Sequence, residues 1–463
     1  MIESIYINNF KSVLDDTIKL KPLTVLIGAN GSGKSNLIKA LEFLSIIPMS
    51  GVEAAARKYG GFWGIIPKSV PLREAGRLHI RFKYRTELPP PQKYPKDYPP
   101  VTVEHDIELG RSSKYIIRVV GESITFNQVL AVAQTKLGSK ESNELPVEPK
   151  WRDSSLTLKF GKRGSIHFHS DPPISKDNLG LYLEWFGMGY LKKDMRPSLL
   201  RGFIPYLYRD RDKKDAQSRS QREIHESLLD PTMFSILSSS RHANMFKTML
   251  RFTRRYDLLL NELRTEQPTS DLSLMSPNGQ NMPTVLRLLN ANPDQKDAID
   301  RLSRTFGTIA PYIESFGTQS LRSGKEYVEF IESSLGRGVE SWESSDGSLR
   351  ALAILLALET HLPNSTILIE EPEQNLHPWA IRSIMEHIRE IIKERNLQVI
   401  ISTHSQQVLE CVNPDEVLVV TRSLKQGTKF KPLEDLVPSK KLVMGEIGDM
   451  WVKGLLGGVP SDD

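Results

Sequence analysis

One stretch of the sequence decides the fold: Leu23-Thr24-Val25-Leu26-Ile27-Gly28-Ala29-Asn30-Gly31-Ser32-Gly33-Lys34-Ser35. Its apolar first part is typical of a strand that is buried on both faces of a parallel sheet. Its second part matches the spacing G-x-x-x-x-G-K-[ST], in which glycines let backbone N–H groups surround phosphates. Apolar residues then recur at helical spacing, at Leu37, Ile38, Leu41 and Leu44. The order of strand, glycine loop and helix predicts a phosphate-binding loop rather than a turn that binds nothing.

The ligand that we expect at this loop is ATP, with Mg²⁺ as cofactor. Lys34 would contact the β- and γ-phosphates, Ser35 would ligate the metal, and the helix start would add its partial positive charge. The residues predicted to bind nucleotide are Asn30, Gly31, Ser32, Gly33, Lys34, Ser35 and Asn36.

A second buried-strand pattern, Thr366–Ile369, runs into adjacent acids, Glu370 and Glu371. Paired carboxylates at the carboxyl end of a strand suit metal-assisted phosphoryl transfer. Glu370 would hold Mg²⁺, and Glu371 would orient and polarise the attacking water. A charged strand end is the alternative interpretation of the acids alone, and the glycine loop favours the catalytic one.

A strand–helix–strand unit follows the acids. Pro378 opens a helical apolar stripe, and Val399–Thr403 reads as another buried strand. A parallel crossover between the two strands would bring His404 to the edge that carries the acids. We expect His404 to contact the γ-phosphate; a structural cap is the alternative. The predicted catalytic residues are Glu371, His404 and Lys34.

The segment Ser344-Ser345-Asp346-Gly347-Ser348 precedes a helical pattern just before the acidic strand. It is similar to the L-S-G-G signature of ABC-class ATPases, with Ser344 in place of leucine. The resemblance implies that Ser345 and Gly347 contact the γ-phosphate of ATP bound to another subunit. Exposed N–H groups at a helix start favour an anion, and the same residues can also cap the helix.

A narrower resemblance covers about the first 45 residues and the stretch 326–410. The segments I-N-N-F-K-S, G-A-N-G-S-G-K-S-N, I-E-E-P-E-Q-N-L-H-P and S-T-H-S look like the RecF/OLD-like, SMC-related group of bacterial ABC ATPases. Many ABC proteins carry aspartate where this chain has Glu370. Asn375 and His377 match the D-loop that crosses the family's dimer interface, or they cap a turn. The sequence does not identify which glutamine helps to hold Mg²⁺, and Phe10 and Lys11 are candidates for adenine stacking.

The resemblance implies an α/β fold: an ABC-type P-loop ATPase head with an antiparallel β side sheet and an inserted helical subdomain. Alternation predicts side-sheet strands at Arg77–Tyr84, Val101–Glu108, Lys114–Val120 and Leu156–His169. Helices are expected between Asn178 and Ser315, most clearly at Ser240–Arg264 and Thr284–Phe306. We therefore divide the chain into an N-terminal lobe (1–175), the insertion (176–320), a C-terminal lobe (321–430) and a tail (431–463) that docks on this chain or a partner.

Positive charge gathers in the insertion, where the segment from Leu191 to Leu260 has 15 basic and 8 acidic residues while the whole chain carries +5. A nucleic-acid surface is one interpretation of this excess; a solvated helical face or a docking surface for an acidic partner is the other. The residues concerned are Lys192, Lys193, Arg196, Arg201, Arg209, Arg211, Lys213, Lys214, Arg251, Arg254 and Arg255.

The composition indicates a reduced, cytoplasmic protein, because no apolar run reaches membrane-spanning length, no secretion signal opens the chain, and Cys411 is a single cysteine. We expect an ATP-hydrolysing switch that forms ATP-sandwich homodimers or larger homo-oligomers. By resemblance it would be a sensor or regulator in anti-phage defence that controls a separate effector, a nuclease or toxin. The alternative is a DNA-binding ATPase of RecF/SMC type in repair or recombination. A transporter ATPase is disfavoured by the large insertion.

Overall fold

The computed structural model describes residues 1–69, 77–86, 101–111, 117–127, 155–160, 166–171, 250, 252–334, 336–437 and 446–456. The chain divides into two compact units. One comprises Met1, Leu20–Ser45 and Phe252–Asp463, and the other comprises Ile2–Lys19 and Ile46–Arg251. Most of the predicted insertion, including the basic residues from Lys192 to Lys214 and Arg251, lies outside the described residues.

The first unit is built on a sheet in which parallel strands surround the glycine loop. The strand order is β17(Gly427–Pro432), β16(Val417–Ser423), β3(Leu23–Ile27), β15(Gln398–Ser402), β14(Thr366–Glu370) and β9(Arg254–Tyr256). All neighbours pair in parallel except β16 and β17, which form an antiparallel hairpin. Because β3, β14 and β15 are parallel, the glycine loop, the acids and His404 follow the carboxyl ends of adjacent strands.

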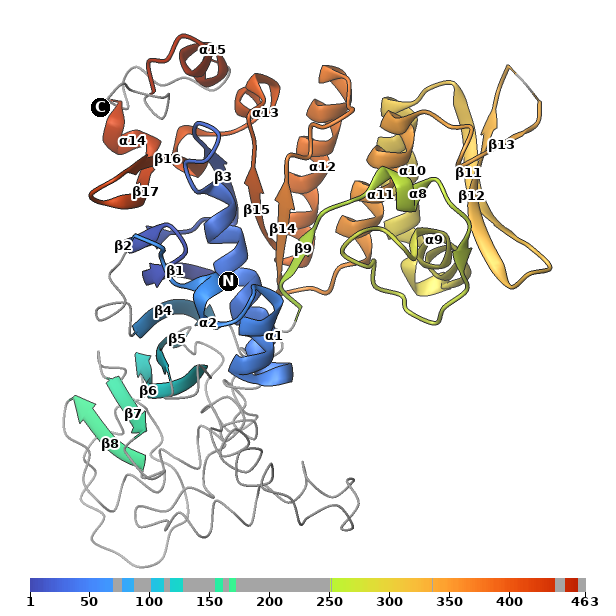
Figure 1. Cartoon of the computed structure of the whole chain (residues 1–463). Coiled ribbons are helices and arrows are strands. Elements are labelled where there is room, and N and C mark those ends of the chain that lie inside the picture. Colours follow the sequence, from blue (N-terminus) through green and yellow to red (C-terminus); the bar gives the residue numbers. More distant parts are fainter. Residues whose placement is uncertain are drawn as a thin grey trace, which may run out of the picture. The chain divides into compact units, whose positions relative to one another are not determined.

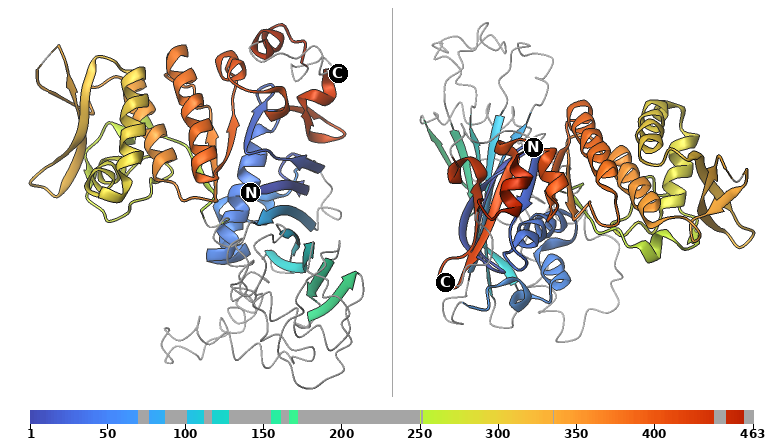
Figure 2. Two further views of the ribbon diagram at one scale, coloured as in Figure 1. Left: turned by 180° about the vertical axis from the view of Figure 1, so that it is seen from behind. Right: turned by 90° about the horizontal axis from the view of Figure 1, so that it is seen from above.

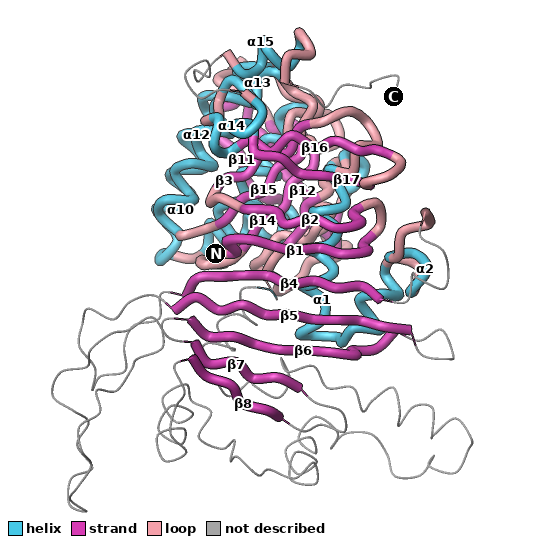
Figure 3. Tube along the Cα trace, turned by 90° about the vertical axis from the view of Figure 1, so that its left-hand side faces the viewer, coloured by secondary structure: helices cyan, strands magenta, loops and turns pink. Residues whose placement is uncertain are grey.

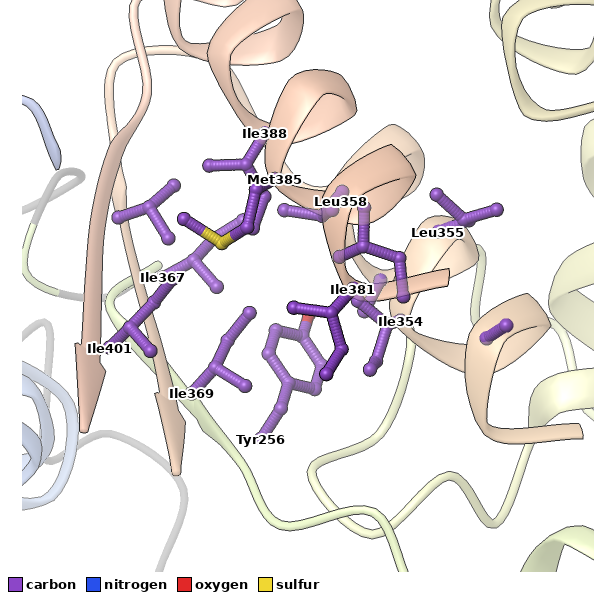
Figure 4. Packing of buried hydrophobic residues seen from close by; sticks show 14 of the residues in the cluster. Tyr256, Ile354, Leu355, Leu358, Ile367, Ile369, Ile381, Met385, Ile388 and Ile401 are labelled. Atoms are coloured by element: carbon purple, nitrogen blue, oxygen red, sulfur yellow. The ribbon is translucent and has the colours of Figure 1, made fainter. Parts of the chain in front are cut away.

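Helix α12(Pro378–Arg395) packs against one face of these strands, and α11(Asp346–Thr360) packs beside α12. Figure 4 shows Ile381, Met385 and Ile388 of α12 lying against Ile367 and Ile369 of β14 and Ile401 of β15. Nearly every residue of α11 is buried, including Leu352, Leu355 and Leu358. A helix that is apolar all round needs neighbours on several sides, and α10(Lys296–Ile309) is one of them.

A smaller antiparallel sheet completes this unit. It contains β10(Gln267–Pro268), β12(Lys325–Glu332) and β11(Ile313–Ser320), and β13(Gly338–Glu340) pairs with β12. Helices α9(Met282–Ala291) and α10(Lys296–Ile309) lie beside it (Figure 1). Figure 2 shows the same helices and strands from behind and from above. The predicted helix Thr284–Phe306 is therefore two helices, because Pro293 begins a separate 3-10 turn, Pro293–Gln295.

The predicted helix Ser240–Arg264 is wrong over its second half. Arg254–Tyr256 is strand β9, in register with Ile367–Ile369 of β14, and Leu260–Leu263 is a single helical turn, α8. In place of a helical face, Tyr256 fills the core and is 1% exposed. Pairing with the buried strand β14 outweighs local propensity here.

The second unit is an antiparallel sheet, as the sequence predicts for the side sheet. Its strand order is β8(Ile166–Asp171), β7(Ser155–Phe160), β6(Ile117–Asn127), β5(Val101–Arg111), β4(Arg77–Thr86), β1(Ile2–Phe10) and β2(Val13–Lys19) (Figure 3). The predicted strand Leu156–His169 is in fact the two strands β7 and β8. Helix α2(Phe62–Ile65) lies in this unit, and Phe10 is fully buried core, which removes it as a candidate for adenine stacking.

The described part of the tail packs on the first unit. Helix α15(Ile447–Val452) contacts α13(Gln406–Glu410), where Gln406 donates a 2.8 Å hydrogen bond to Asp449. Ile447 and Leu456 are buried, whereas Val452 and Leu455 are exposed. Among the described helices, none combines the length and the apolar character that crossing a membrane requires. The α/β class and the antiparallel side sheet expected from the sequence are confirmed.

Candidate nucleotide-binding site

The glycine loop is held by its own backbone and by the hairpin β16–β17. Gly31 and Gly33 have φ angles of 78° and 107°, a region that favours glycine. Thr428 of β17 donates a 2.7 Å hydrogen bond to the carbonyl of Ser32, and Arg422 of β16 donates one of 3.3 Å to that of Gly31. A side chain at Gly28 would place its Cβ 2.3 Å from the Val420 carbonyl oxygen. The loop therefore lies flush against the hairpin.

Lys34 is the first residue of α1(Lys34–Lys58), and it is 7% exposed. Its Nζ donates to the carbonyl oxygens of Gly28 (2.8 Å) and Ala29 (3.2 Å), so the ammonium group is folded over the loop. Burial lowers the pKa of Lys34 to about 8, although the negative charges of Glu371, Glu370 and Glu373 oppose that shift. A desolvated cation beside a loop of N–H donors is a strong anion-binding arrangement.

Ser35 and Glu370 meet as the sequence predicts for a metal site. The Ser35 hydroxyl donates to Glu370 Oε2 at 2.5 Å, across 335 residues of chain. The other oxygen of Glu370 lies 2.6 Å from Nε of Arg255 in β9. Hydroxyl and carboxylate oxygens are ligands that Mg²⁺ prefers.

Glu371 has an unusual backbone for a residue that is not glycine. Its φ is 48°, and its N–H donates to the carbonyl of Ser402 at 2.8 Å. Arg350 of α11 donates to the Glu371 carbonyl at 3.2 Å, and Gln374 donates to its carboxylate at 2.5 Å. Sparsely populated backbone conformations of this kind persist when neighbours fix them, and they concentrate at functional sites.

His404 follows β15 and is fixed through its backbone. Oε1 of Glu373 accepts hydrogen bonds from the Thr403 hydroxyl (2.6 Å) and the His404 N–H (3.0 Å). Desolvation and the positive charge of Lys34 lower the pKa of His404, against the opposing effect of Glu371 and Glu373. The charges of Lys34, Glu371 and Glu373 therefore all act on the His404 side chain.

The signature segment begins α11, and Ser345 is its N-cap, accepting a 3.1 Å hydrogen bond from the Ser348 N–H. Arg264 holds the segment: it pairs with the Asp346 carboxylate and donates to the carbonyl oxygens of Ser344 (2.9 Å) and Trp342 (2.8 Å). Asn375 also donates to Asp346, at 3.2 Å.

A Cβ at Gly347 would lie 3.0 Å from the Asn375 carbonyl oxygen. Within the described residues, no hydrogen bond joins Ser345 or Gly347 to the glycine loop of the same chain. His377 caps α12 and accepts a hydrogen bond from Trp379 at 3.3 Å.

Sequence reasoning missed the residues that hold this site from a distance. Arg255 and Arg264 were assigned to a helix, and Arg254 and Arg255 to a basic surface. Arg254 instead donates to the Met275 carbonyl at 2.7 Å, and Arg255 pairs with Glu370. Arg350, which donates to the Glu371 carbonyl, is not indicated by any sequence pattern. These arginines carry no local motif, so only strand pairing and helix packing reveal them.

The residues present fit a magnesium nucleotide. Ser32 Oγ is buried in the loop without a hydrogen-bond partner, as is suitable for a group that a phosphate would satisfy. Gly28 allows close approach of the backbone, Lys34 supplies a buried cation, and Ser35 with Glu370 supplies oxygen ligands.

Comparisons with known proteins point to ATPases. Residues 1–46 match a family described as "AAA ATPase domain". Residues 188–410 match a family described as "AAA domain, putative AbiEii toxin, Type IV TA system". A search of curated proteins finds no match.

Solved structures similar to this chain include SMC head domains. One, from Pyrococcus yayanosii and carrying a coiled coil and joint, has 11% identity and a TM-score of 0.42, over 98% of this chain and 99% of that one. A second, from Pyrococcus furiosus and bound to the C-terminal domain of ScpA, has 14% identity and a TM-score of 0.41, over 94% and 97%. A third, from Thermotoga maritima, has 12% identity and a TM-score of 0.34, over 93% and 98%. By its two family matches, the chain carries ATPase-domain sequence on both sides of the side-sheet strands β4–β8.

Proposed function

We propose that this protein is a Mg²⁺-dependent ATP hydrolase that works as a molecular switch, with two copies enclosing ATP between them. The observation that carries the proposal is the Ser35–Glu370 contact, which joins the glycine loop to the acidic strand. A hydroxyl and a carboxylate at hydrogen-bond distance, beside a buried lysine, are the groups with which phosphate-binding-loop ATPases hold Mg²⁺ and the phosphates.

Each residue of this set has a part in the reaction. Asn30, Gly31, Ser32, Gly33 and Asn36 lie on the loop and first turn that would surround the phosphates with N–H groups, and Lys34 would turn from its carbonyl partners to the β- and γ-phosphates. Ser35 and Glu370 would hold Mg²⁺, which when bound neutralises charge on the phosphates. Glu371 would orient the attacking water and accept its proton, and His404 would contact the γ-phosphate.

The second copy would contribute the signature. Ser345 and Gly347 lie at the start of α11, where unpaired N–H groups favour an anion. Within the described residues they make no hydrogen bond to their own glycine loop, so they are available to the nucleotide of a partner. The homodimer, or a larger assembly built from it, would form with ATP and open after hydrolysis.

The switch would report to a separate effector, a nuclease or toxin, in defence against phage. Support comes from the family matched by residues 188–410, whose description names a toxin–antitoxin system. A cytoplasmic location accords with this role.

The test uses Glu371→Gln, which keeps the shape of the side chain and removes the base. ATP hydrolysis should fall by roughly 100-fold or more, and ATP with Mg²⁺ should shift the protein to a dimer or larger species in light scattering. Lys34→Ala in the same background should abolish that shift. Glu390→Gln, which alters an exposed pair with Arg304, is the matched control and should behave as the parent.

Two outcomes would contradict the proposal. Parental hydrolysis by Glu371→Gln would remove Glu371 as the base. A mass that does not respond to nucleotide would replace the switch by a constitutive assembly.

DNA binding in repair or recombination remains the alternative function. It depends on the basic residues from Lys192 to Arg211, since Arg254 and Arg255 are engaged in the first unit. Salt-dependent DNA binding that weakens when Lys192, Lys193, Arg209 and Arg211 are changed to glutamate would favour it.

A further inference from the structure

Arg255 lies beside the carboxylate that would bind the metal. β9 pairs in parallel with β14, with Tyr256 in register with Ile369, so Arg255 and Glu370 come to one edge of the sheet. Nε of Arg255 is 2.6 Å from Glu370 Oε1, and the two side chains are only 22% and 18% exposed. At this distance, with little water around the two groups, the opposite charges attract each other.

Both oxygens of Glu370 are engaged, one with Arg255 and the other with the Ser35 hydroxyl at 2.5 Å. Each carboxylate oxygen can accept more than one partner, so Mg²⁺ can still approach Glu370, but it must share the carboxylate with the positive charge of the guanidinium. Ser35 is itself an expected ligand, so the guanidinium is the group that competes with the metal. Two cations at one carboxylate also repel each other strongly where water is scarce.

The guanidinium has other carboxylates within reach. Its NH2 lies 3.1 Å from Asp257 Oδ2, and its NH1 lies 3.8 Å from Glu42 Oε2 on α1. Leaving Glu370 would therefore not strand a positive charge, because a short rotation keeps Arg255 beside Asp257 and Glu42.

We propose, resting on the metal site of the proposed function, that Arg255 is a positioning residue that acts as the internal counter-ion of Glu370. In the nucleotide-free protein it holds the carboxylate in place. When Mg²⁺ arrives with ATP, the guanidinium moves to Asp257 and Glu42. The metal affinity of the protein is thus set by competition with Arg255, and Asp257 favours the metal-bound state by receiving the guanidinium.

Metal binding itself is the readout that separates this role from a merely structural one. The probe is Mn²⁺, whose free concentration is followed by electron paramagnetic resonance in the presence of a non-hydrolysable ATP analogue. Arg255→Gln should tighten Mn²⁺ binding by roughly five- to tenfold, because the competing charge is gone. Asp257→Asn should weaken it by about two- to threefold, because the guanidinium then stays on Glu370.

The double variant Arg255→Gln/Asp257→Asn distinguishes competition from the general effect of removing charge. Under competition Asp257→Asn has little further effect once Arg255 is gone, whereas independent charge effects would add. Arg304→Gln removes the same charge at an exposed pair with Glu390 and should leave Mn²⁺ binding unchanged. Additive effects, or parental affinity in both single variants, would overturn the proposal.

Two safeguards keep these outcomes distinct. Glu370→Gln must weaken Mn²⁺ binding; if it does not, the metal site of the proposed function is wrong, whatever Arg255 does. Asp257 is 62% exposed, so Asp257→Asn tests the proposal even if the loss of Arg255 prevents folding. Parental Mn²⁺ affinity in Asp257→Asn would then be enough to reject it.

Discussion

The glycine loop before α1 and the signature segment before α11 are both helix starts proposed to bind the same phosphates, yet they are held in different ways. Gly31 and Gly33 give the first loop its shape through positive φ angles. The signature segment takes its support from Arg264, which lies 82 residues before Asp346 in the chain. The glycine loop is therefore shaped by its own residues, whereas the signature segment is held by a residue from a distant part of the chain.

The two helix starts also differ in charge. α1 begins with Lys34, whereas α11 carries Asp346 in its first turn. The acid would repel a phosphate unless it were neutralised. The Arg264 guanidinium, aided by Asn375, lowers the pKa of Asp346 and so keeps it ionised and paired. The signature segment therefore needs the charge of Arg264, from another part of the chain, before it can bind an anion. The glycine loop has a cation of its own, Lys34.

The largest effect on stability and ATP binding is expected from a change in the glycine loop. Gly28→Ala puts a Cβ 2.3 Å from the backbone oxygen of Val420, which cannot rotate away. The loop or the hairpin must shift, so we expect the unfolding free energy to fall by about 2 kcal/mol. ATP binding, followed with a fluorescent analogue, should be lost. Chemical denaturation measures the first effect.

Gly307→Ala is the control for this change. Gly307 lies inside α10, and a Cβ there meets nothing within 4 Å. Alanine should stabilise the helix by about 0.5–1 kcal/mol and leave ATP binding intact. If Gly28→Ala bound ATP with parental affinity, the hairpin would have no part in shaping the loop.

Removing Arg264 from the signature segment should have a smaller effect, which is confined to ATP-dependent assembly. Arg264→Gln leaves the charge of Asp346 uncompensated and removes donors from the carbonyls of Ser344 and Trp342. In the Glu371→Gln background, ATP-dependent assembly should weaken by roughly tenfold or more, at about 1.4 kcal/mol per tenfold. ATP binding to the single subunit should stay near the parental value, because the glycine loop is untouched. Analytical ultracentrifugation measures the first property, and nucleotide titration measures the second.

A double variant tests whether Arg264 acts through its attraction to the charge of Asp346. Arg264→Gln/Asp346→Asn removes both charges and should regain part of the assembly. If the double variant assembles no better than Arg264→Gln, the arginine acts through the carbonyls alone. If Arg264→Gln assembled normally, the signature segment would need no outside support.

The same contrast explains how much could be predicted from the sequence. The strands Leu23–Ile27 and Thr366–Glu370, and the helix that starts beside Ser345, follow from contiguous patterns, and the structure has them there. β9 was missed because it is three residues long, and its partner β14 lies more than 100 residues further along the chain. The sequence predicts a helix over this stretch, but pairing with the buried strand β14 decides the structure.

The candidate site divides in the same way. The spacing of the glycine loop and of the paired acids predicted that Ser35 and Glu370 would lie together, and they do. Their roles in catalysis stay predictions. Arg255, Arg264 and Arg350 could not be predicted, because each contacts backbone or carboxylate groups of another element, and no local sequence pattern reveals such a contact.

The smallest expected effect concerns the dependence of ATP binding on pH. Burial lowers the pKa of Lys34 to about 8 in the nucleotide-free protein. Bound phosphates favour the protonated lysine and raise its pKa, so binding takes up a proton once the pH exceeds about 8. ATP affinity should therefore be level below that pH and fall above it, by at most about tenfold per pH unit.

The stability of the free protein should change in the opposite direction. Between pH 8 and the ordinary lysine pKa of 10.5 the unfolded chain binds more protons, and stability rises with pH.

Calorimetric titration of ATP in buffers of different ionisation enthalpy measures this proton uptake directly. Lys34→Arg should bind ATP without the fall above pH 8, because a guanidinium stays charged throughout this range. Asp346 cannot produce the effect, because Arg264 and Asn375 hold its pKa below the usual range of a carboxyl group. A fall in affinity that persisted in Lys34→Arg would assign the titration to another group. A level profile in the parent would mean that Lys34 stays fully charged beside the acids, and that the carboxylates of Glu370 and Glu371 outweigh its burial.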